Sequence, residues 1–88
     1  MRAAFYETLG PAKDVLKVGE LPKPAPEAGE VLVRVQASGV NPSDVKMRLG
    51  TSSATNEFPR IVPHSDGAGL IEAVGAGVPG ARIGERVW

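Results

Sequence analysis

The apolar positions of the chain fall into short runs separated by glycine and proline, and the clearest run follows Gly29. One apolar set alternates there with a more polar set, namely Val31, Val33, Val35 and Ala37 against Leu32, Arg34, Gln36 and Ser38. A period of two is typical of a strand with one apolar face. The pattern therefore predicts a strand over residues 31–38 whose odd-numbered side chains face a core.

Further extended runs lie at both ends of the chain. Residues 1–6 and 15–18 are short apolar stretches, and Gly10-Pro11 between them is a strong turn signal, so we expect a hairpin or meander. Residues 70–74 have strand character, and residues 83–88 begin another strand. The proline-rich residues 21–26 lack backbone donors at three positions and predict an extended connector between strands.

One short helix is predicted over the segment that opens at Asn41. Asparagine is a good N-cap, Pro42 suits the first helical position, and Asp44 in the first turn favours the positive end of the helix dipole. Gly50 should end the helix, since glycine readily adopts the left-handed conformation of a C-cap. Residues 51–56 are small and polar and predict a loop.

The glycine spacing of Gly75-Ala76-Gly77-Val78-Pro79-Gly80 matches that of a dinucleotide-binding loop. Pro79 and the nearby Gly84 leave no room for the long helix whose N-terminus would hold a pyrophosphate, so a turn is favoured. With strands, one helix and strands again in order, the 88 residues predict a single mainly β domain built as a small, rolled-up antiparallel sheet.

Composition excludes several classes of function. The chain has no cysteine, which removes disulfides and thiolate metal sites, and its ten basic residues balance ten acidic ones. A neutral chain predicts neither a nucleic acid nor an anionic membrane as partner. The apolar runs are too short to span a bilayer and no signal peptide is visible, so we expect a soluble, cytoplasmic protein.

The only histidine, His64, stands beside Ser65 and Asp66. Three adjacent loop residues do not readily align a nucleophile, a base and an orienting carboxylate, since these contacts come from residues that the fold brings together. We therefore expect a loop histidine that is exposed or hydrogen-bonded to backbone. One histidine and no cysteine also argue against a zinc site.

Two stretches carry a family resemblance, residues 29–44 (GEVLVRVQASGVNPSD) and residues 63–75 (PHSDGAGLIEAVG), the second followed by IGERV at 83–87. Together with the start MRAA, they resemble the N-terminal part of medium-chain dehydrogenase/reductases. In the zinc enzymes of that superfamily a cysteine ligand stands where this chain has Asn41, and the ligand histidine falls on Ser65. With both metal positions lost, the chain is similar to the zinc-independent quinone oxidoreductase branch.

The resemblance implies contacts to cofactor or substrate at Asn41, Ser43, Lys46 and Ser65, with no catalytic residue and no metal ligand in this chain. Asn41 falls where the family lines its active-site cleft, although a pure N-cap role is the alternative and the residue could serve both. Ser43 matches a proton-relay hydroxyl, with a solvent-facing helix residue as the alternative. Lys46 lies near an often aromatic position, with a solvated helix lysine as the alternative. Asp66 matches the acidic residue of the family's Gly-His-Glu, and a structural carboxylate is favoured there over a catalytic one.

The resemblance further implies a chaperonin-10-like β-barrel over residues 1–88 and a Rossmann domain that this chain lacks. The function expected is the substrate side of an oxidoreductase that passes hydride from NADPH to a quinone or activated alkene; a homo-oligomer is compatible with it. The 88 residues alone should be inactive, and their end on a strand at Trp88 suggests truncation. The alternative is a stand-alone β-barrel binding or assembly module, which would need an apolar docking loop, whereas residues 51–56 are short and polar.

Overall fold

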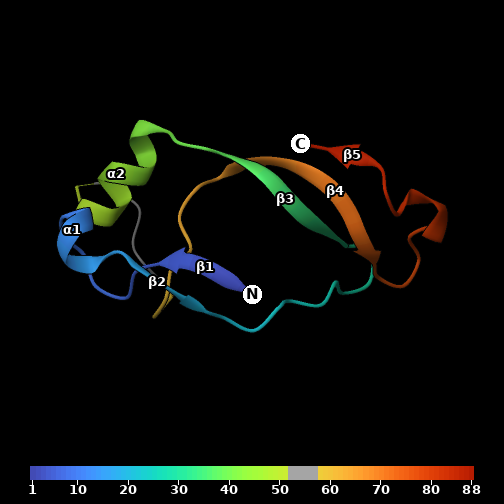
Figure 1. Cartoon of the computed structure of the whole chain (residues 1–88), viewed down its shortest axis with the longest axis horizontal. Helices are drawn as coiled ribbons and strands as arrows, with labels where there is room; N and C mark the ends of the chain where they lie inside the picture. Colours follow the sequence, from blue (N-terminus) through green and yellow to red (C-terminus); the bar gives the residue numbers. More distant parts are fainter. Residues whose placement is uncertain (52–57) are drawn as a thin grey trace. The chain divides into compact units, whose positions relative to one another are not determined.

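A computed structural model describes residues 1–51 and 58–88, and the described chain is made mainly of strands with one main helix (Figure 1). The contacts divide the chain into two compact units. The first unit consists of residues 1–22 and 40–65, and the second unit consists of residues 23–39 and 66–88. The predicted loop at 51–56 lies outside the described residues except for Thr51.

The first unit contains a hairpin of strand β1 (Arg2–Phe5) and strand β2 (Lys17–Glu20), which pair antiparallel. The predicted hairpin is thus confirmed, but the second strand starts later than the expected run at 15–18. A four-residue helix α1 (Ala12–Val15) takes up Val15 instead, and its side chain is buried. Pro11 precedes this turn of helix, and the backbone N–H of Leu16 closes it on the carbonyl of Ala12 at 2.9 Å.

The chain after β1 is tied to the rest of the first unit by backbone hydrogen bonds. The N–H and the carbonyl of Tyr6 both bond to Ile61, each at 2.9 Å. The Gly10 N–H donates to the carbonyl of Arg48 at 2.9 Å, and Nη1 of Arg48 returns a bond to the Gly10 carbonyl at 2.8 Å. Tyr6 is 1% exposed and forms the centre of this unit's small core.

Helix α2 (Pro42–Leu49) has the boundaries that the sequence predicts. The carboxylate of Asp44 accepts a hydrogen bond of 2.7 Å from the backbone N–H of Asn41, in the arrangement of a capping box. Gly50 ends the helix with a φ of 77°, a left-handed conformation that glycine adopts without a steric penalty. The caps therefore fix both ends of the element that carries Ser43 and Lys46.

The second unit is an antiparallel three-stranded sheet in the order β3 (Val31–Gly39), β4 (Asp66–Val74) and β5 (Arg86–Val87) (Figure 1). A short 3₁₀ helix η1 (Gly80–Arg82) precedes β5. The strand predicted over residues 83–88 is therefore too long. Gly84 has a φ of 92°, outside the strand region, and delays the start of the pairing.

The expected alternation of β3 is only partly right. Val33 lies opposite Ile71, which is 2% exposed, but Val35 is 58% exposed and Ala37 is exposed as well. The register against β4 shifts between Leu32 and Val33 and again between Val35 and Ala37. The second shift changes the face on which Ala37 lies relative to Val35, because a bulge adds a residue to one strand. Val35 precedes this shift and lies opposite Gly69, which has no side chain to cover it.

The turn predicted for residues 75–80 is confirmed, as the backbone there leads from β4 to η1. The predicted fold class is confirmed too, since antiparallel strands dominate beside one main helix, although the strands divide between two sheets. Among the described residues no helix is long and apolar enough to cross a membrane.

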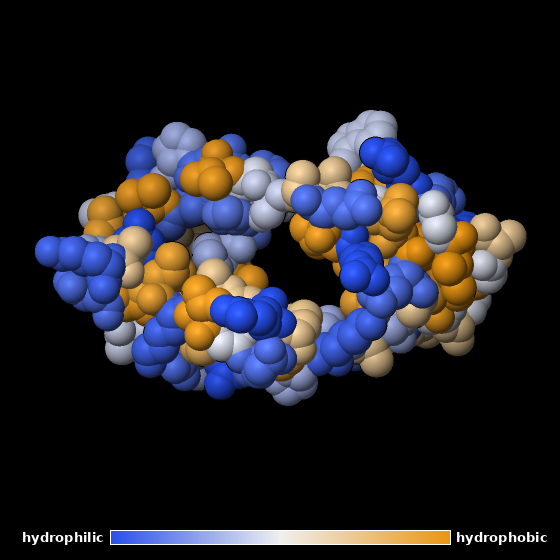
Figure 2. Space-filling view, viewed as in Figure 1, coloured by the Kyte–Doolittle hydropathy of each residue, from blue (hydrophilic) through white to orange (hydrophobic). Residues whose placement is uncertain are grey.

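Several large apolar side chains reach the surface of each unit, and Figure 2 shows apolar areas on the face it presents. Phe58 and Val18 of the first unit are 68% and 64% exposed, and Trp88 of the second unit is 96% exposed. The buried apolar side chains found among the described residues are Tyr6, Val15 and Ile71. Each unit thus has a small core and a partly apolar surface.

Candidate functional site

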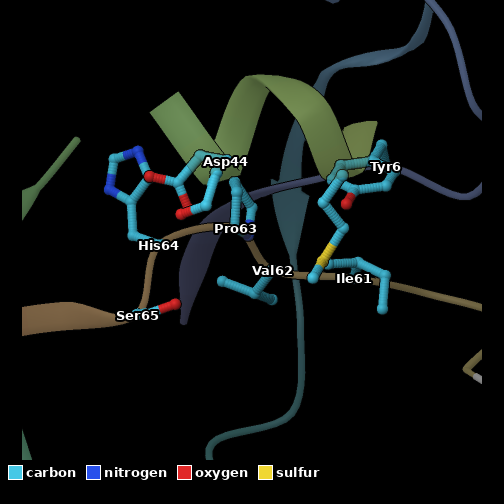
Figure 3. A pocket seen from close by; sticks show the side chains of 9 residues that line it. Tyr6, Asp44, Ile61, Val62, Pro63, His64 and Ser65 are labelled. Atoms are coloured by element: carbon cyan, nitrogen blue, oxygen red, sulfur yellow. The ribbon is translucent and has the colours of Figure 1, made fainter. Parts of the chain in front are cut away.

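A pocket of about 150 Å³ opens in the first unit (Figure 3). Three segments build it: Tyr6 just after β1, one side of α2, and residues 61–65. The lining residues are Tyr6, Ser43, Asp44, Met47, Ile61, Val62, Pro63, His64 and Ser65. The backbone bonds between Tyr6 and Ile61 hold two of these segments together.

The pocket has differently composed sides. In Figure 3 the side chains of Asp44, His64 and Ser65 lie at one side, whereas Tyr6 and Ile61 lie at the other. The first side offers hydroxyl, carboxylate and imidazole groups. The second side consists of the phenol ring of Tyr6, with its hydroxyl, and the aliphatic side chain of Ile61. An apolar wall with a few polar groups is the usual make-up of a small-molecule site.

The Tyr6 hydroxyl is held in its protonated form. Burial raises the pKa of the Tyr6 hydroxyl above its ordinary value, the positive charge of Arg48 lowers it, and the negative charge of Asp44 raises it further. At neutral pH the phenol therefore keeps its proton and can donate a hydrogen bond.

Two of the four predicted contact residues, Ser43 and Ser65, line the pocket. Asn41 is half-buried at the N-cap of α2, and Lys46 is an exposed residue of the same helix; neither belongs to the lining of this pocket. Asp66 is exposed and begins β4. The fold therefore brings together two hydroxyls that are far apart in sequence.

The pocket also contains residues that the sequence analysis missed as site residues: Tyr6, Met47, Ile61, Val62 and Pro63. Tyr6 sits at the end of a predicted strand and Met47 inside a predicted helix, where both are ordinary core residues. The prolines and apolar residues at 59–63 also lack the side-chain groups by which a binding site is recognised in a sequence. Only the pairing of Tyr6 with Ile61 places these groups beside the serines.

His64 is exposed, as predicted for a loop histidine, but its backbone is unusual. Its φ is 82°, the only positive value at a non-glycine residue in the described part of the chain. A side chain at such a φ crowds the backbone at a cost of about 1–2 kcal/mol.

We therefore expect His64→Gly to be more stable to unfolding than His64→Ala, by about 1 kcal/mol. Both substitutions remove the imidazole, but only glycine accepts the positive φ without strain. Urea denaturation of the two variants, followed by circular dichroism, measures the difference. Equal stability of the two variants would show that the φ at residue 64 carries no strain.

The two positions that correspond to zinc ligands in the zinc enzymes of the superfamily, Asn41 and Ser65, carry neither a thiolate nor an imidazole. Structural and catalytic zinc sites take thiolate, imidazole and carboxylate ligands. Ser65 supplies a neutral hydroxyl and Asn41 a neutral amide, and the chain has no cysteine. In residues 1–51 and 58–88 no group of three or more histidine, cysteine or acidic side chains is placed to hold a metal ion.

The glycine-rich segment does not fit a dinucleotide either. β4 ends at Val74, and the helix that follows the turn, η1, has three residues. A pyrophosphate site of the βαβ type needs the N-terminus of a long helix at that point. The described part of this chain thus lacks the phosphate-binding element of a nicotinamide cofactor.

Comparison with protein-family models matches residues 27–88 to the alcohol dehydrogenase GroES-like domain. Among curated relatives, a quinone oxidoreductase of Rattus norvegicus is 43% identical over 90 residues; the match covers 100% of this chain and 26% of the relative. The chain thus spans about a quarter of the length of the curated relatives it matches.

Solved structures of similar fold belong to longer chains as well. A thermostable alcohol dehydrogenase of Pyrobaculum aerophilum with bound cobalt and zinc superposes with a TM-score of 0.83 at 41% identity, over 99% of this chain and 25% of its own. A mycobacterial protein in complex with NADPH superposes with a TM-score of 0.81 at 31% identity, over 98% of this chain and 26% of its own.

Proposed function

The chain belongs to the family of alcohol dehydrogenase GroES-like domains, and on that premise we propose that it is the substrate-side domain of an oxidoreductase. The resemblance to medium-chain dehydrogenase/reductases drawn from the sequence agrees with this membership. The proposed reaction is hydride transfer from reduced nicotinamide, NADPH, to a quinone or an activated alkene. The alternative of a stand-alone binding module has no observation in its favour.

The observation that carries this proposal is the pair of hydroxyls, Ser43 and Ser65, in one pocket of the first unit. The identity with quinone oxidoreductases supports the choice of acceptor, and the structural neighbour in complex with NADPH supports the choice of cofactor. We propose that these serines bind the carbonyl oxygen of the acceptor.

A bound nicotinamide would supply two electrons and a proton as hydride. As an acceptor is reduced, negative charge develops on its carbonyl oxygen. The hydroxyls of Ser43 and Ser65 would donate hydrogen bonds to that oxygen, and the apolar residues Ile61 and Val62 would keep the ring in place and limit access of water. A proton from solvent completes the reduction, so no side chain of this chain acts as an acid.

We propose supporting roles for the two other predicted contact residues. Asn41 caps the helix that carries Ser43, so it fixes the position of that hydroxyl while its amide meets the nicotinamide or the acceptor. Lys46 is exposed on the same helix, and we propose that it lies at the margin of the cleft, near the cofactor or substrate.

We propose that a Rossmann domain outside this chain completes the enzyme. The short helix after β4 leaves the pyrophosphate without a site in the described residues. The exposed apolar side chains, among them Phe58 and Val18 of the first unit and Trp88 of the second, are surfaces that a second domain would cover. The isolated 88 residues are then expected to be inactive.

We also propose that the reaction needs no zinc, because Asn41 and Ser65 stand where the zinc enzymes of the superfamily keep a thiolate and an imidazole. Neutral oxygen and amide donors bind Zn²⁺ far less well than these groups. The proposed acceptor is polarised by hydroxyl donors instead.

The test is turnover by the protein at its natural length. We expect it to oxidise NADPH in the presence of 1,4-benzoquinone, and to keep this activity after dialysis against a chelator. The measurement is the loss of absorbance of the reduced nicotinamide with and without the quinone. Dehydrogenation of a simple alcohol that the chelator abolishes, with no quinone reduction, would contradict the proposal.

A further inference from the structure

The pocket of the first unit carries a hydroxyl that the proposed mechanism does not use, that of Tyr6. The Tyr6 side chain lines the pocket while the residue is only 1% exposed. Figure 3 shows its hydroxyl turned toward the pocket, on the side away from His64 and Ser65. Two backbone bonds of 2.9 Å to Ile61 fix the residue, so the phenol is presented from a rigid position.

The size of the pocket restricts what can bind between these two sides. A cavity of about 150 Å³ with apolar walls is large enough for one benzene ring. The pocket has the same volume, about 150 Å³, and is bounded by aliphatic side chains at Ile61 and Val62. It is therefore large enough for one six-membered ring.

The chemistry of the two sides matches a ring with two opposed acceptors. Ser65 offers a hydroxyl at one side and Tyr6 a hydroxyl at the other. A 1,4-quinone carries a carbonyl oxygen at each end of a six-membered ring, whereas a cyclic enone carries a single one. When a bound ring separates the Tyr6 hydroxyl from water, leaving that donor without an acceptor costs free energy. The site should therefore favour a ring whose two carbonyl oxygens accept from both Ser65 and Tyr6.

We propose that the Tyr6 hydroxyl binds the second carbonyl oxygen of a single-ring 1,4-quinone, the oxygen remote from the serines. Tyr6 is then a specificity-determining residue that separates quinones from simple enones. The inference rests on the proposed function, because it takes the quinone as the acceptor.

The protonation of Tyr6 agrees with this role. Burial raises the pKa of the phenol, so it stays a donor throughout the neutral range. The charged and titratable groups about it are Arg48, Asp44 and, across the pocket, His64. A carbonyl oxygen is an acceptor only, and it complements a phenol that donates.

The test compares 1,4-cyclohexanedione with cyclohexanone as probes. The two rings differ by one carbonyl at the far end and neither is reduced in the absence of cofactor. Affinities are measured by saturation-transfer NMR on the natural-length protein without NADPH. We expect the unchanged protein to bind the dione about fivefold more tightly than the monoketone, in line with one added hydrogen bond.

Tyr6→Phe keeps the ring and removes the hydroxyl. It should abolish the preference by weakening the dione about fivefold while the monoketone binds as before. Ser65→Ala at the opposite side should weaken both probes, because each has a carbonyl for that end. Equal losses of both probes in Tyr6→Phe, no loss of either, or no preference in the unchanged protein would overturn the proposal.

Two features keep the result interpretable. Circular dichroism of Tyr6→Phe establishes that it folds, and if it does not, a preference for the dione in Ser65→Ala still reports on Tyr6, because that variant leaves the far hydroxyl in place. The binding experiment contains no cofactor. It can therefore fail while quinone turnover stands, or succeed while turnover is absent, which separates this inference from the proposed function.

Discussion

Replacing Gly69 by alanine is expected to destabilise the second unit by about 3 kcal/mol or more. Gly69 is buried in the central strand β4 and lies opposite Val35 on one side and Val87 on the other. An added Cβ would overlap the carbonyl oxygen of Arg34 and lie 2.9 Å from the Cα of Val35. Both obstacles are backbone atoms of β3, so no side-chain rotation relieves the clash.

The measurement is the free energy of unfolding from urea titrations of Gly69→Ala beside a matched control. Gly80→Ala serves as the control, because an added Cβ at Gly80 meets no atom within 4 Å. We expect Gly80→Ala to unfold within about 0.5 kcal/mol of the unchanged protein. A Gly69→Ala variant as stable as its control would mean that β3 and β4 do not approach each other as closely as described.

Removing the two serine hydroxyls of the pocket by Ser43→Ala and Ser65→Ala is expected to lower kcat/KM for quinone reduction about 100-fold. The loss should fall mainly on kcat, because hydrogen bonds to the acceptor oxygen strengthen as negative charge develops on it. Each single variant should lose less than the pair, since the remaining hydroxyl still donates to the same oxygen. Steady-state kinetics of the natural-length protein with NADPH and 1,4-benzoquinone measures these losses.

The control for this pair is Thr8→Ala. Thr8 is exposed in the first unit and does not line the pocket, so its removal deletes a hydroxyl of the same kind elsewhere. We expect its kinetics to match those of the unchanged protein. If the double serine variant also keeps its kcat/KM, the acceptor oxygen is stabilised by other groups and the proposed site is wrong.

Local chemistry explains why the boundaries of α2 follow from the sequence. Asn41, Asp44 and Gly50 act on backbone groups within a turn of themselves, so their effect needs no distant partner. The strands β1 and β3 follow in the same way from runs of apolar residues bounded by glycine and proline, whereas β4 begins at Asp66, before the predicted run at 70–74. The missed helix α1 is a single turn after Pro11, too short to show a period.

The face of a strand, in contrast, depends on its partner. The pattern at residues 31–38 placed Val35 and Ala37 in a core, but Val35 lies opposite Gly69, which has no side chain to cover it, and a register shift separates Val35 from Ala37. Bulges are set by how two strands pair over their whole length, which no single run of residues records. The length of β5 also depends on a tertiary contact. Gly84 adopts its positive φ in a turn whose backbone N–H donates to the carbonyl of Ile71 in β4, and β5 starts only after this turn.

The fold and the candidate site likewise combine features that local sequence sets with features that depend on tertiary contacts. The sequence by itself determined the mainly β fold and the capped helix, because each depends on residue type and near neighbours. The tertiary structure alone decided that Tyr6, Ser43 and Ser65 share one pocket, and that Asn41 and Lys46 do not line it. The bonds between Tyr6 and Ile61 join segments distant in sequence, and such contacts arise only when the whole first unit has folded.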